Sequence, residues 1–471
     1  MKKERKVKVA VIGAGTAGLS AFREASGENS DCVLINGGPY GTTCARVGCM
    51  PSKVFIQAAN DYYHRRVFER KGIKNSDRLS LDRRELLKYV RSLRDYFVSG
   101  VLKSIEKLGD KNIPGYARFV EPNVLEVEGQ KIIAEAVVIA TGSSPVVPGP
   151  WRDYGDRVIT TDDIFEEGTL NDDIAVIGAG VIGLELGQAL SRMEIKIEMV
   201  EGSENIGGIS DPAVNRYAIE ALREEFNLYL GQPAELSLNG NQLELTRAGK
   251  KQVFAQALIA VGRSPNIPGL ELEKIGIPLD DKGMPEVDFS TMQIKDAPIF
   301  MAGDVNGYRP FLHEVADEGR IAGYNAVREE NRCFKGRTPL TIVFTAPQIV
   351  MAGKQYREIK EDPHIIGEAS FESQGRARIM DENRGILRIY AEPRRGKLLG
   401  AEMMAPEGEY IGHLLAWAIQ QELTAFEVLN MPFYHPTIVE GLRTAIRDLS
   451  AKVEGPRPES ELAPCGVLPV E

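Results

Sequence analysis

Long apolar runs are missing from this sequence of 471 residues. No stretch of 18 consecutive apolar residues occurs, so we expect no membrane-spanning helix and no membrane partner. The basic residues 1–6 are followed by an apolar run that glycines interrupt and that has no cleavage site. A secretory signal peptide is therefore not expected either.

Cysteine is scarce, and its five residues are unevenly spaced: Cys32, Cys44, Cys49, Cys333 and Cys465. This spacing does not form the disulfide framework of a small secreted protein. It favours a reducing compartment, for which we expect the cytoplasm. Cys44 and Cys49 have no second Cys or His pair at ligand spacing to complete a tetrahedral site, so we predict no metal centre.

An excess of positive charge is also missing. The chain has 57 Lys and Arg against 67 Asp and Glu, which gives a net charge of −10 at pH 7. This balance disfavours nucleic acids and anionic membranes as partners. With 43% hydrophobic and 26% charged residues, the composition is that of a globular chain of two to four domains with ample core.

The sequence does contain a pair of cysteines separated by four residues, in the glycine-containing stretch 41–53. Pro51 and Ser52 are predicted to form the first turn of a helix that continues through residue 59. The partial positive charge at a helix N-terminus favours thiolates, so we expect lowered thiol pKa values. Two such thiols can form a disulfide and reopen it by exchange. For an isolated Cys-x4-Cys pattern, two incidental core cysteines are the alternative.

A dinucleotide-binding pattern precedes the thiols. The apolar, β-branched run 7–12 predicts a buried parallel strand, and a helix-like segment begins at residue 19. Between them lies a G-x-G-x-x-G pattern made of Gly13, Gly15 and Gly18. These glycines form the turn, let the backbone approach a pyrophosphate and let the helix pack on the strand. The next strand ends at Asn36, where this motif usually has an acid that holds a ribose diol.

The same plan repeats after the proline-containing linker 145–155. The second G-x-G-x-x-G pattern consists of Gly178, Gly180 and Gly183. Its following strand, 195–200, ends at Glu201. Two such units in one chain imply two dinucleotides. Glu201 accepts hydrogen bonds from a ribose diol and repels a 2′-phosphate, so we expect NAD rather than NADP.

The remaining segments predict helices and an antiparallel sheet. Residues 54–112 have a helical pattern, and Asp211 followed by Pro212 predicts a helix start. Beyond residue 337 the glycine motifs stop. Segments such as 385–390 and 397–404 predict an antiparallel sheet, flanked by helices near 408–421 and 437–451.

These motifs and their order resemble the pyridine nucleotide-disulfide oxidoreductase family, from about residue 6 to about residue 450. Two later motifs carry the resemblance further: Gly303-Asp304 after an apolar strand, and His435-Pro-Thr followed by Glu440. The resemblance implies an α/β fold with two Rossmann-like domains for FAD and NAD and a C-terminal α+β dimerisation domain. Among the members, those that oxidise dihydrolipoyl groups with NAD+ are the most similar.

The resemblance also implies roles for individual residues. Cys44 and Cys49 would form the redox-active disulfide, with Cys44 facing the substrate thiol and Cys49 beside the flavin. His435 would be the base and Glu440 would orient it. The cofactor-binding positions that match the family are Gly13, Gly15, Gly18, Asn36, Lys53, Ala117, Thr141, Gly142, Gly178, Gly180, Gly183, Glu185, Glu201, Gly262, Arg263, Gly303 and Asp304.

The resemblance further implies a homodimer with shared active sites, because the base of one subunit reaches the disulfide of the other. A lipoyl-bearing carrier protein is the expected partner. The expected domains are an FAD-binding domain with the redox disulfide (1–150), an NAD-binding domain (151–270), a central segment that completes the FAD site (271–336), a dimerisation domain (337–453) and a flexible tail (454–471).

Two other functions stay open. An NADH-dependent reductase of another disulfide would share these motifs. Glutathione-type reductases, which use NADPH, would carry basic residues where this chain has acids in 201–204. A flavoprotein scaffold with secondary catalysis is the other alternative, but it would not need thiols, base and both nucleotide sites together. Mercuric reductases of the family end in a paired dithiol and lack the histidine, whereas this tail has Cys465 alone.

Overall fold

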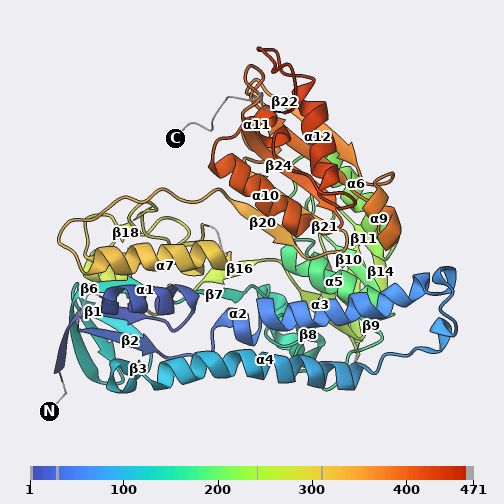
Figure 1. Ribbon diagram of the computed structural model, residues 1–471. Coiled ribbons are helices and arrows are strands. Elements are labelled where there is room, and N and C mark those ends of the chain that lie inside the picture. Colours follow the sequence, from blue (N-terminus) through green and yellow to red (C-terminus); the bar gives the residue numbers. More distant parts are fainter. Residues whose placement is uncertain (1–3, 28–30, 241, 309–310, 463–471) are drawn as a thin grey trace.

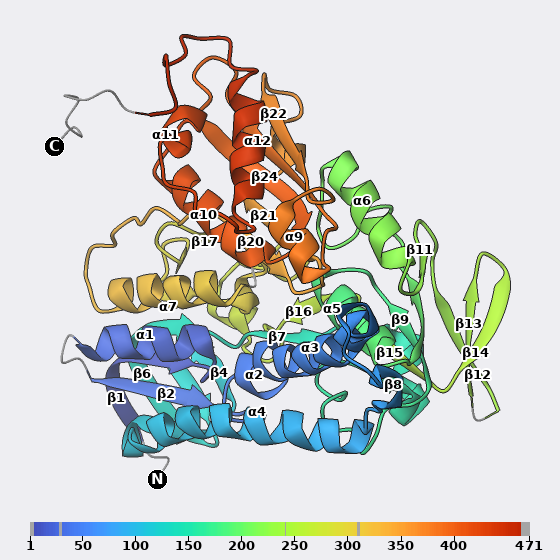
Figure 2. The ribbon, with the colours of Figure 1, turned by 45° about the vertical axis from the view of Figure 1, so that its right-hand side comes forward.

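The computed structural model describes residues 4–27, 31–240, 242–308 and 311–462. Three large β-sheets organise the chain. Two of them, with their helices, lie side by side in the lower part of Figure 1, and the third, formed by the C-terminal part, stands above them. Figure 2 shows the same arrangement after a rotation. This α/β architecture agrees with the predicted fold class.

The first sheet has a parallel centre of buried, apolar strands. Its order is β17-β18-β19-β6-β1-β2-β3, and β4 and β5 form a hairpin beside β6. Since β1 pairs in parallel with β2 and β6, the carboxyl ends of these strands meet at one edge. The strands are β1 (Glu4–Ile12), β2 (Cys32–Asn36), β3 (Asn112–Pro114), β4 (Ala117–Glu121), β5 (Val124–Val127), β6 (Gln130–Ile139), β17 (Val287–Asp288), β18 (Gln293–Ile294) and β19 (Ile299–Met301).

Helix α1 (Thr16–Gly27) packs closely against α7 (Leu312–Ala326) over this sheet (Figure 1). Glycines in α7 permit the close approach. A Cβ atom at Gly319 would overlap the carbonyl oxygen of Ala17, and one at Gly323 would overlap that of Ala21. The packing holds the segment after β19 next to the first glycine motif.

Helices α3 (Cys49–His64) and α4 (Arg83–Glu106) run antiparallel to each other (Figure 1). The prediction of helical structure throughout 54–112 was wrong in its middle part, because 65–82 forms only turns and short 3-10 helices. The carboxylate of Asp82 accepts hydrogen bonds from the backbone N–H groups of residues 84 and 85. Aspartate is a favoured N-cap, so the second helix begins after it.

The second sheet is parallel throughout, in the order β11-β10-β9-β15-β8. Helix α6 begins as predicted, with Pro212 in its first turn and the Asp211 carboxylate accepting hydrogen bonds as the N-cap. The elements are β8 (Val158–Ile159), β9 (Asp173–Ile177), α5 (Val181–Arg192), β10 (Lys196–Val200), α6 (Pro212–Arg223), β11 (Asn227–Tyr229) and β15 (Gln256–Ile259), with an antiparallel excursion of β12 (Glu235–Asn239), β13 (Gln242–Arg247) and β14 (Lys250–Phe254).

A short antiparallel ladder joins these two units. Strand β7 (Ser143–Pro145) pairs with β16 (Arg263–Pro265). The first follows β6 of the first sheet, and the second follows β15 of the second sheet. The turns at the ends of the two nucleotide-binding sheets are thereby held against each other.

The third sheet is antiparallel, in the order β20-β21-β24-β23-β22. The pairing of β23 with β24 confirms the antiparallel sheet predicted from 385–390 and 397–404. The elements are β20 (Leu340–Val343), β21 (Gln348–Gly353), α8 (Tyr356–Ile359), β22 (Ile365–Ser370), α9 (Gly375–Met380), β23 (Ile386–Ala391), β24 (Leu398–Ala405), α10 (Gly408–Gln420), α11 (Ala425–Leu429) and α12 (Glu440–Ser450).

The segment after α12 folds back onto that helix. The Glu461 carboxylate accepts hydrogen bonds from Arg447 Nε at 2.7 Å and from Arg443 at 3.0 Å. These contacts lower the pKa of Glu461 to about 2. Cys465 lies outside the described residues, and the flexibility of the tail stays a prediction. Within the described ranges, no helix combines the length and the apolar character needed to cross a membrane.

The close contact between α1 and α7 can be tested with two glycine substitutions. Gly323→Ala is expected to lower the free energy of unfolding by about 1–3 kcal/mol, because the added methyl group forces the helices apart. Gly100→Ala is the matched control, since Gly100 lies exposed in α4 with open space around an added Cβ. Helix propensity predicts a gain of up to about 1 kcal/mol there. Denaturant unfolding measures both, and equal effects would contradict the assigned role of Gly323.

Candidate active site

The first glycine motif has one open position and two crowded ones. Gly13 has a φ of +108°, and a Cβ atom there would overlap the carbonyl oxygen of Ala140. A Cβ atom at Gly18 would overlap the carbonyl oxygen of Gly13. Gly15, in contrast, has nothing within 4 Å of an added Cβ and lines a cavity. The backbone at Gly15 is therefore free to approach a ligand, as a pyrophosphate requires.

The second motif repeats this geometry in the neighbouring unit. Gly178 has a φ of +106°, and a Cβ atom there would overlap the carbonyl oxygen of Ala260. A Cβ atom at Gly183 would overlap Gly178, whereas Gly180 has open space around it. Both motifs thus leave open space beside the backbone of the middle glycine at the start of a helix.

The residues that end the second strands make equivalent contacts in both units. Asn36 Oδ1 accepts a hydrogen bond from Ala14 N at 3.1 Å, and Glu201 Oε2 accepts one from Ala179 N at 2.7 Å. Asn36 Nδ2 also donates to the carbonyl of residue 38 at 2.6 Å. Asn36 therefore keeps the contact to the glycine loop but brings no negative charge to it.

Ala117 is the first residue of β4. Its neighbour Tyr116 places its ring against the backbone of Gly37, where a Cβ atom would lie 2.5 Å from a ring carbon. Ala117 is itself buried. This contact brings the segment with Ala117 close to Gly37, which follows Asn36. The resemblance to the family leads us to expect the adenine end of the dinucleotide here.

Cys44 and Cys49 are free thiols in direct contact. Cys44 lies in the short helix α2 (Thr43–Arg46), which the Thr42 hydroxyl caps by accepting a hydrogen bond from Ala45 N. Cys49 is the first residue of α3, so this helix begins two residues earlier than the sequence predicted. Cys49 therefore lies closer to the positive end of the helix dipole than expected.

The two thiols differ in acidity. The hydrogen bond that Cys44 donates to Cys49 lowers the pKa of Cys49 to about 7, and the Lys53 charge acts in the same direction. The same hydrogen bond, together with burial, raises the pKa of Cys44. Cys49 is thus the thiol that ionises first.

Lys53 and Glu185 form an ion pair next to the thiols. Lys53 Nζ lies 2.7 Å from Glu185 Oε2, and the Glu185 side chain is 5% exposed. Glu185 Oε1 accepts a hydrogen bond from Phe344 N at 2.9 Å, and Lys53 Nζ lies over the Phe344 ring. The pair joins the helix that carries Cys49 to the first helix of the second nucleotide-binding unit.

The two closing turns bond to each other through backbone and side chains. Asn266 N donates to the Gly142 carbonyl at 2.9 Å, and Val146 N donates to the Gly262 carbonyl at 3.0 Å. The Thr141 hydroxyl donates to the Asn266 carbonyl at 2.7 Å. These contacts keep the predicted positions 141, 142 and 262 beside both glycine motifs.

The Gly303-Asp304 turn lies directly after β19 and next to α1. Gly303 has a φ of +85°, and a Cβ atom there would lie 2.9 Å from the Cβ of Ala17. Glu318 Oε2 accepts hydrogen bonds from Gly303 N at 2.7 Å and from Asn306 Nδ2 at 2.8 Å. Burial raises the pKa of Glu318 to about 7. Glu318 of α7 therefore holds the backbone of the turn that contains Asp304.

One cavity of about 970 Å³ connects most of these groups. The described residues that line it include Gly15, Cys44, Cys49, Lys53, Gly142, Glu185, Arg263, Gly303, Asp304, His313, His413 and Trp417. A cavity of this size holds a large cofactor or ligand. In the part of the chain that the structure describes, no group of three or more His, Cys, Asp or Glu is arranged to hold a metal ion.

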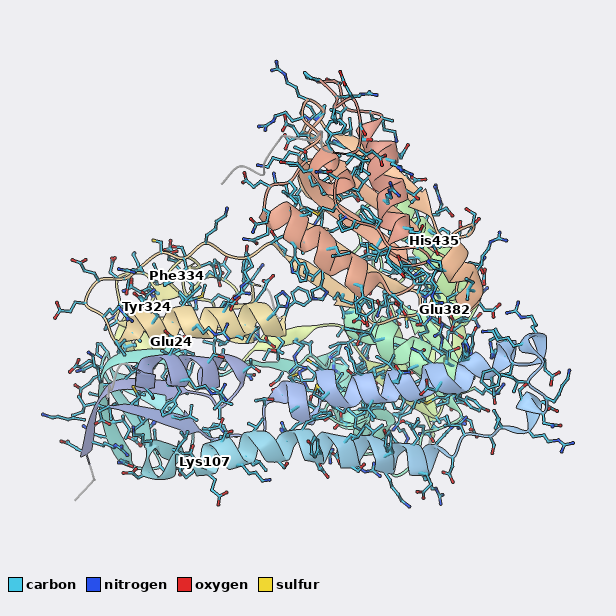
Figure 3. All side chains as sticks on the ribbon, in the orientation of Figure 1. Glu24, Lys107, Tyr324, Phe334, Glu382 and His435 are labelled. Atoms are coloured by element: carbon cyan, nitrogen blue, oxygen red, sulfur yellow. The ribbon has the colours of Figure 1, made fainter. Side chains whose placement is uncertain are left out.

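His435 and Glu440 form a pair elsewhere. Figure 3 shows His435 on the C-terminal domain. His435 Nδ1 lies 3.0 Å from Glu440 Oε1, and Glu440 Oε2 accepts a hydrogen bond from Thr437 N at 3.1 Å. The His435 contact holds the pKa of Glu440 below its ordinary value. The His435 side chain is 81% exposed. Neither residue is among the described residues that line the cavity.

Sequence reasoning missed several residues that hold the site together. Ser143 bonds to Asp304 and Arg263, Glu318 supports the Gly303 turn, and Phe344 bonds to Glu185. Ser143 lies next to the predicted Gly142 in the same turn, which was a usable signal. Glu318 and Phe344 lie in segments with no motif, so their contacts depend on tertiary packing.

Comparisons with known proteins agree with this geometry. Residues 7–328 match the family model described as pyridine nucleotide-disulphide oxidoreductase, and residues 340–446 match the dimerisation domain of that family. The chain belongs to this family. It is therefore an FAD-dependent oxidoreductase that uses a pyridine nucleotide. The C-terminal match supports the predicted homodimer.

Curated relatives include proteins with different substrates. A dihydrolipoyl dehydrogenase of Haloferax volcanii is 30% identical and aligns over 92% of this chain and 94% of its own length. A dihydrolipoyl dehydrogenase of Bacillus subtilis is 29% identical over 93% of this chain and 97% of its own length. A mercuric reductase of Bacillus cereus is 28% identical over 93% of this chain and 70% of its own length. These relatives support the family without deciding the substrate.

Solved structures show the same fold. The flavoprotein disulfide reductase RclA of Escherichia coli, in a Cu(II) complex, superposes with a TM-score of 0.83 at 20% identity and covers 94% of this chain and 99% of its own. LpdA of Mycobacterium tuberculosis superposes with a TM-score of 0.83 at 23% identity and covers 94% of this chain and 100% of its own. At this identity the likeness concerns the fold alone.

The unequal acidity of the thiols predicts their alkylation. In the reduced protein, Cys49 is expected to react with iodoacetamide with a pH midpoint near 7, because the thiolate is the nucleophile and forms above that pKa. Cys44 is expected to react only at much higher pH. Mass spectrometry of peptides after timed labelling measures both rates, with Cys333, an exposed free cysteine, as the internal reference. Faster labelling of Cys44 than of Cys49 at pH 7 would contradict the assignment.

Proposed function

We propose that the chain is a dihydrolipoyl dehydrogenase, which oxidises dihydrolipoyl groups to the disulfide and reduces NAD+. The observation that carries the proposal is the contact between Cys44 and Cys49 in a cavity that also contains the Lys53–Glu185 pair. Relatives at 29–30% identity that bear this name support the substrate. We further propose a lipoyl-bearing carrier protein as partner and the cytoplasm as location.

The residues present fit the two cofactors of the family. FAD would be held by the open backbone at Gly15, by Asp304 and by the Asn36 end of the sheet, since the first two line one cavity with the thiols. NAD would be held at Gly180 and Glu201 in the second unit. When bound, FAD supplies a two-electron path between the dithiol and NAD+.

The thiols would exchange with the substrate in two displacements. A dihydrolipoyl thiolate attacks Cys44 Sγ of the oxidised pair, the bond between Cys44 and Cys49 breaks, and Cys49 leaves as a thiolate. The second substrate thiol then displaces Cys44, so the substrate becomes a disulfide and the protein a dithiol. Because a thiol of lower pKa leaves faster, the acidity of Cys49 suits its leaving role.

A base must take the proton from the attacking thiol. His435 fits this role because Glu440 contacts its Nδ1, which leaves Nε2 free to accept a proton. A charged Glu440 would also stabilise the imidazolium that forms. Since His435 lies outside the cavity of its own chain, we assign each site His435 of the partner subunit.

The second nucleotide site favours NAD over NADP. Both Glu201 oxygens accept backbone hydrogen bonds, from Ala179 N and from Ser203 N at 2.9 Å, which fixes the carboxylate at the end of β10. Such an acid can accept further hydrogen bonds from a ribose diol. Its charge would repel a 2′-phosphate at the same position.

Steady-state turnover tests the proposed substrates. The purified protein is expected to oxidise dihydrolipoamide with NAD+, and to prefer NAD+ over NADP+ by about 100-fold in kcat/KM, a few kcal/mol of discrimination. Cys44→Ser should abolish turnover. Glu201→Gln should reduce the preference, whereas the control Glu204→Gln should change it less.

A negative result with dihydrolipoamide would reject the proposed substrate. In that case, NADH-dependent reduction of another member of a disulfide panel would identify the alternative reductase. Equal efficiency with NAD+ and NADP+ in the unmodified protein would contradict the role of Glu201. A yellow protein with no turnover on any disulfide would favour a scaffold.

A mixed dimer tests the shared site. Cys44→Ser chains and His435→Gln chains are each expected to be nearly inactive as homodimers. In a heterodimer, one of the two sites combines an intact Cys44 with an intact His435, so about half of the activity per dimer should return. Differently tagged chains, co-expressed and purified through both tags, provide the sample. Heterodimers without recovered activity would contradict the shared site.

A further inference from the structure

Ser143 connects the two nucleotide-binding units through its side chain. Its hydroxyl donates a hydrogen bond to Asp304 Oδ2 at 2.9 Å and accepts one from Arg263 Nε at 2.8 Å. Arg263 also donates to the Ser143 carbonyl at 2.7 Å. All three residues line the cavity of the thiols. The hydroxyl therefore lies between the acid of the first unit and a cation from the closing turn of the second.

The chemistry of the partners fixes the direction of the hydroxyl proton. Arginine has only donors, so the Ser143 oxygen must accept from Arg263. An ionised carboxylate has only acceptors, so the hydroxyl must donate to Asp304. A hydroxyl polarised by a cation in this way is a stronger donor. The hydrogen bond from Ser143 thereby fixes Oδ2 of Asp304, so that Oδ1 can accept a hydrogen bond from a ligand.

Within the described residues, no other group donates a hydrogen bond to the Asp304 carboxylate. The backbone of its turn is fixed separately, because Glu318 accepts from Gly303 N. Ser143 therefore controls the rotation of the Asp304 side chain and not the position of its Cα. This separates the effect of Ser143 from that of the packing below the turn.

We infer that Ser143 is a positioning residue that orients Asp304 for a hydroxyl of the bound FAD and links this acid to Arg263 of the second unit. The inference rests on the proposed function, in which Asp304 holds FAD. The inference predicts that three hydrogen-bonded side chains from the two units, those of Asp304, Ser143 and Arg263, help to retain FAD. Removal of the middle group should weaken FAD binding through the lost orientation of Asp304.

Ser144 provides a matched control in the same strand. Its hydroxyl donates to Asn266 Oδ1 at 2.9 Å, so its removal also costs one hydrogen bond between the two closing turns. Ser144 is exposed and does not line the cavity among the described residues. A general loosening of the β7–β16 ladder would therefore affect both serines, whereas orientation of Asp304 involves Ser143 alone.

The experiment measures the rate of FAD release from diluted holoenzyme by the fluorescence of free flavin. Ser143→Ala is expected to release FAD about 10-fold faster, which corresponds to loss of a hydrogen bond to a charged group. Ser144→Ala should stay within about twofold of the unmodified protein, and Ser143→Thr, which keeps the hydroxyl, should restore most of the retention. If Ser143→Ala does not fold, Ser143→Cys replaces it, because a thiol is a weak donor.

A double-mutant cycle with Asp304→Asn distinguishes the inference from the function on which it rests. If Ser143 acts through Asp304, the effect of Ser143→Ala should largely disappear in the Asp304→Asn background. Additive effects, or equal effects at Ser143 and Ser144, would overturn the inference. If Asp304→Asn itself leaves FAD release unchanged, the proposed role of Asp304 fails instead.

Discussion

One buried carboxylate, that of Glu185, holds three parts of the chain together next to the thiols. It forms an ion pair with Lys53 of helix α3, which also carries Cys49. It also accepts a hydrogen bond from Phe344 N of the C-terminal domain. A carboxylate at this depth needs such partners, because an unpaired buried charge costs several kcal/mol. The Lys53 charge also lowers the pKa of Cys49. The packing of the domains and the reactivity of the thiol therefore depend on the same ion pair.

The two nucleotide-binding units show which features of the motif are structural and which select a ligand. Asn36 and Glu201 each accept a hydrogen bond from the backbone N–H at the equivalent position of their own glycine loop. The amide oxygen satisfies this contact as well as a carboxylate does, so the fold tolerates the loss of the acid at Asn36. Only Glu201 adds a negative charge at this position, which in the proposed function would distinguish a ribose diol from a 2′-phosphate. The departure at Asn36 thus leaves the loop contact intact and removes only the negative charge.

The sequence predicted the parts of the fold that depend on local patterns. The glycine positions, the Asp211 cap and the antiparallel strands after residue 385 were all confirmed. Element boundaries were less predictable. Helix α3 begins at Cys49, with Gly48 as its N-cap, and residues 65–82 form turns and short 3-10 helices instead of a continuous α-helix. Ser143 was missed because its role requires Asp304, which lies 161 positions away in the chain. Its place beside Gly142 marks it as part of the turn, but the contact with Asp304 depends on tertiary packing.

In the proposed mechanism, the position of His435 divides the tasks of the site between two subunits. The cavity contains two histidines of the same chain, His313 and His413. Burial lowers the pKa of His313, which opposes the imidazolium that a base must form. His413 directs Nδ1 to the Glu409 carbonyl and so lacks a carboxylate on that nitrogen. His435 has that carboxylate partner but is exposed, so as the proposed base it would act on a surface that its own chain does not supply. In the proposed dimer, a second subunit would supply that surface and would bring His435 to the two thiols, whose pKa values are set within their own chain.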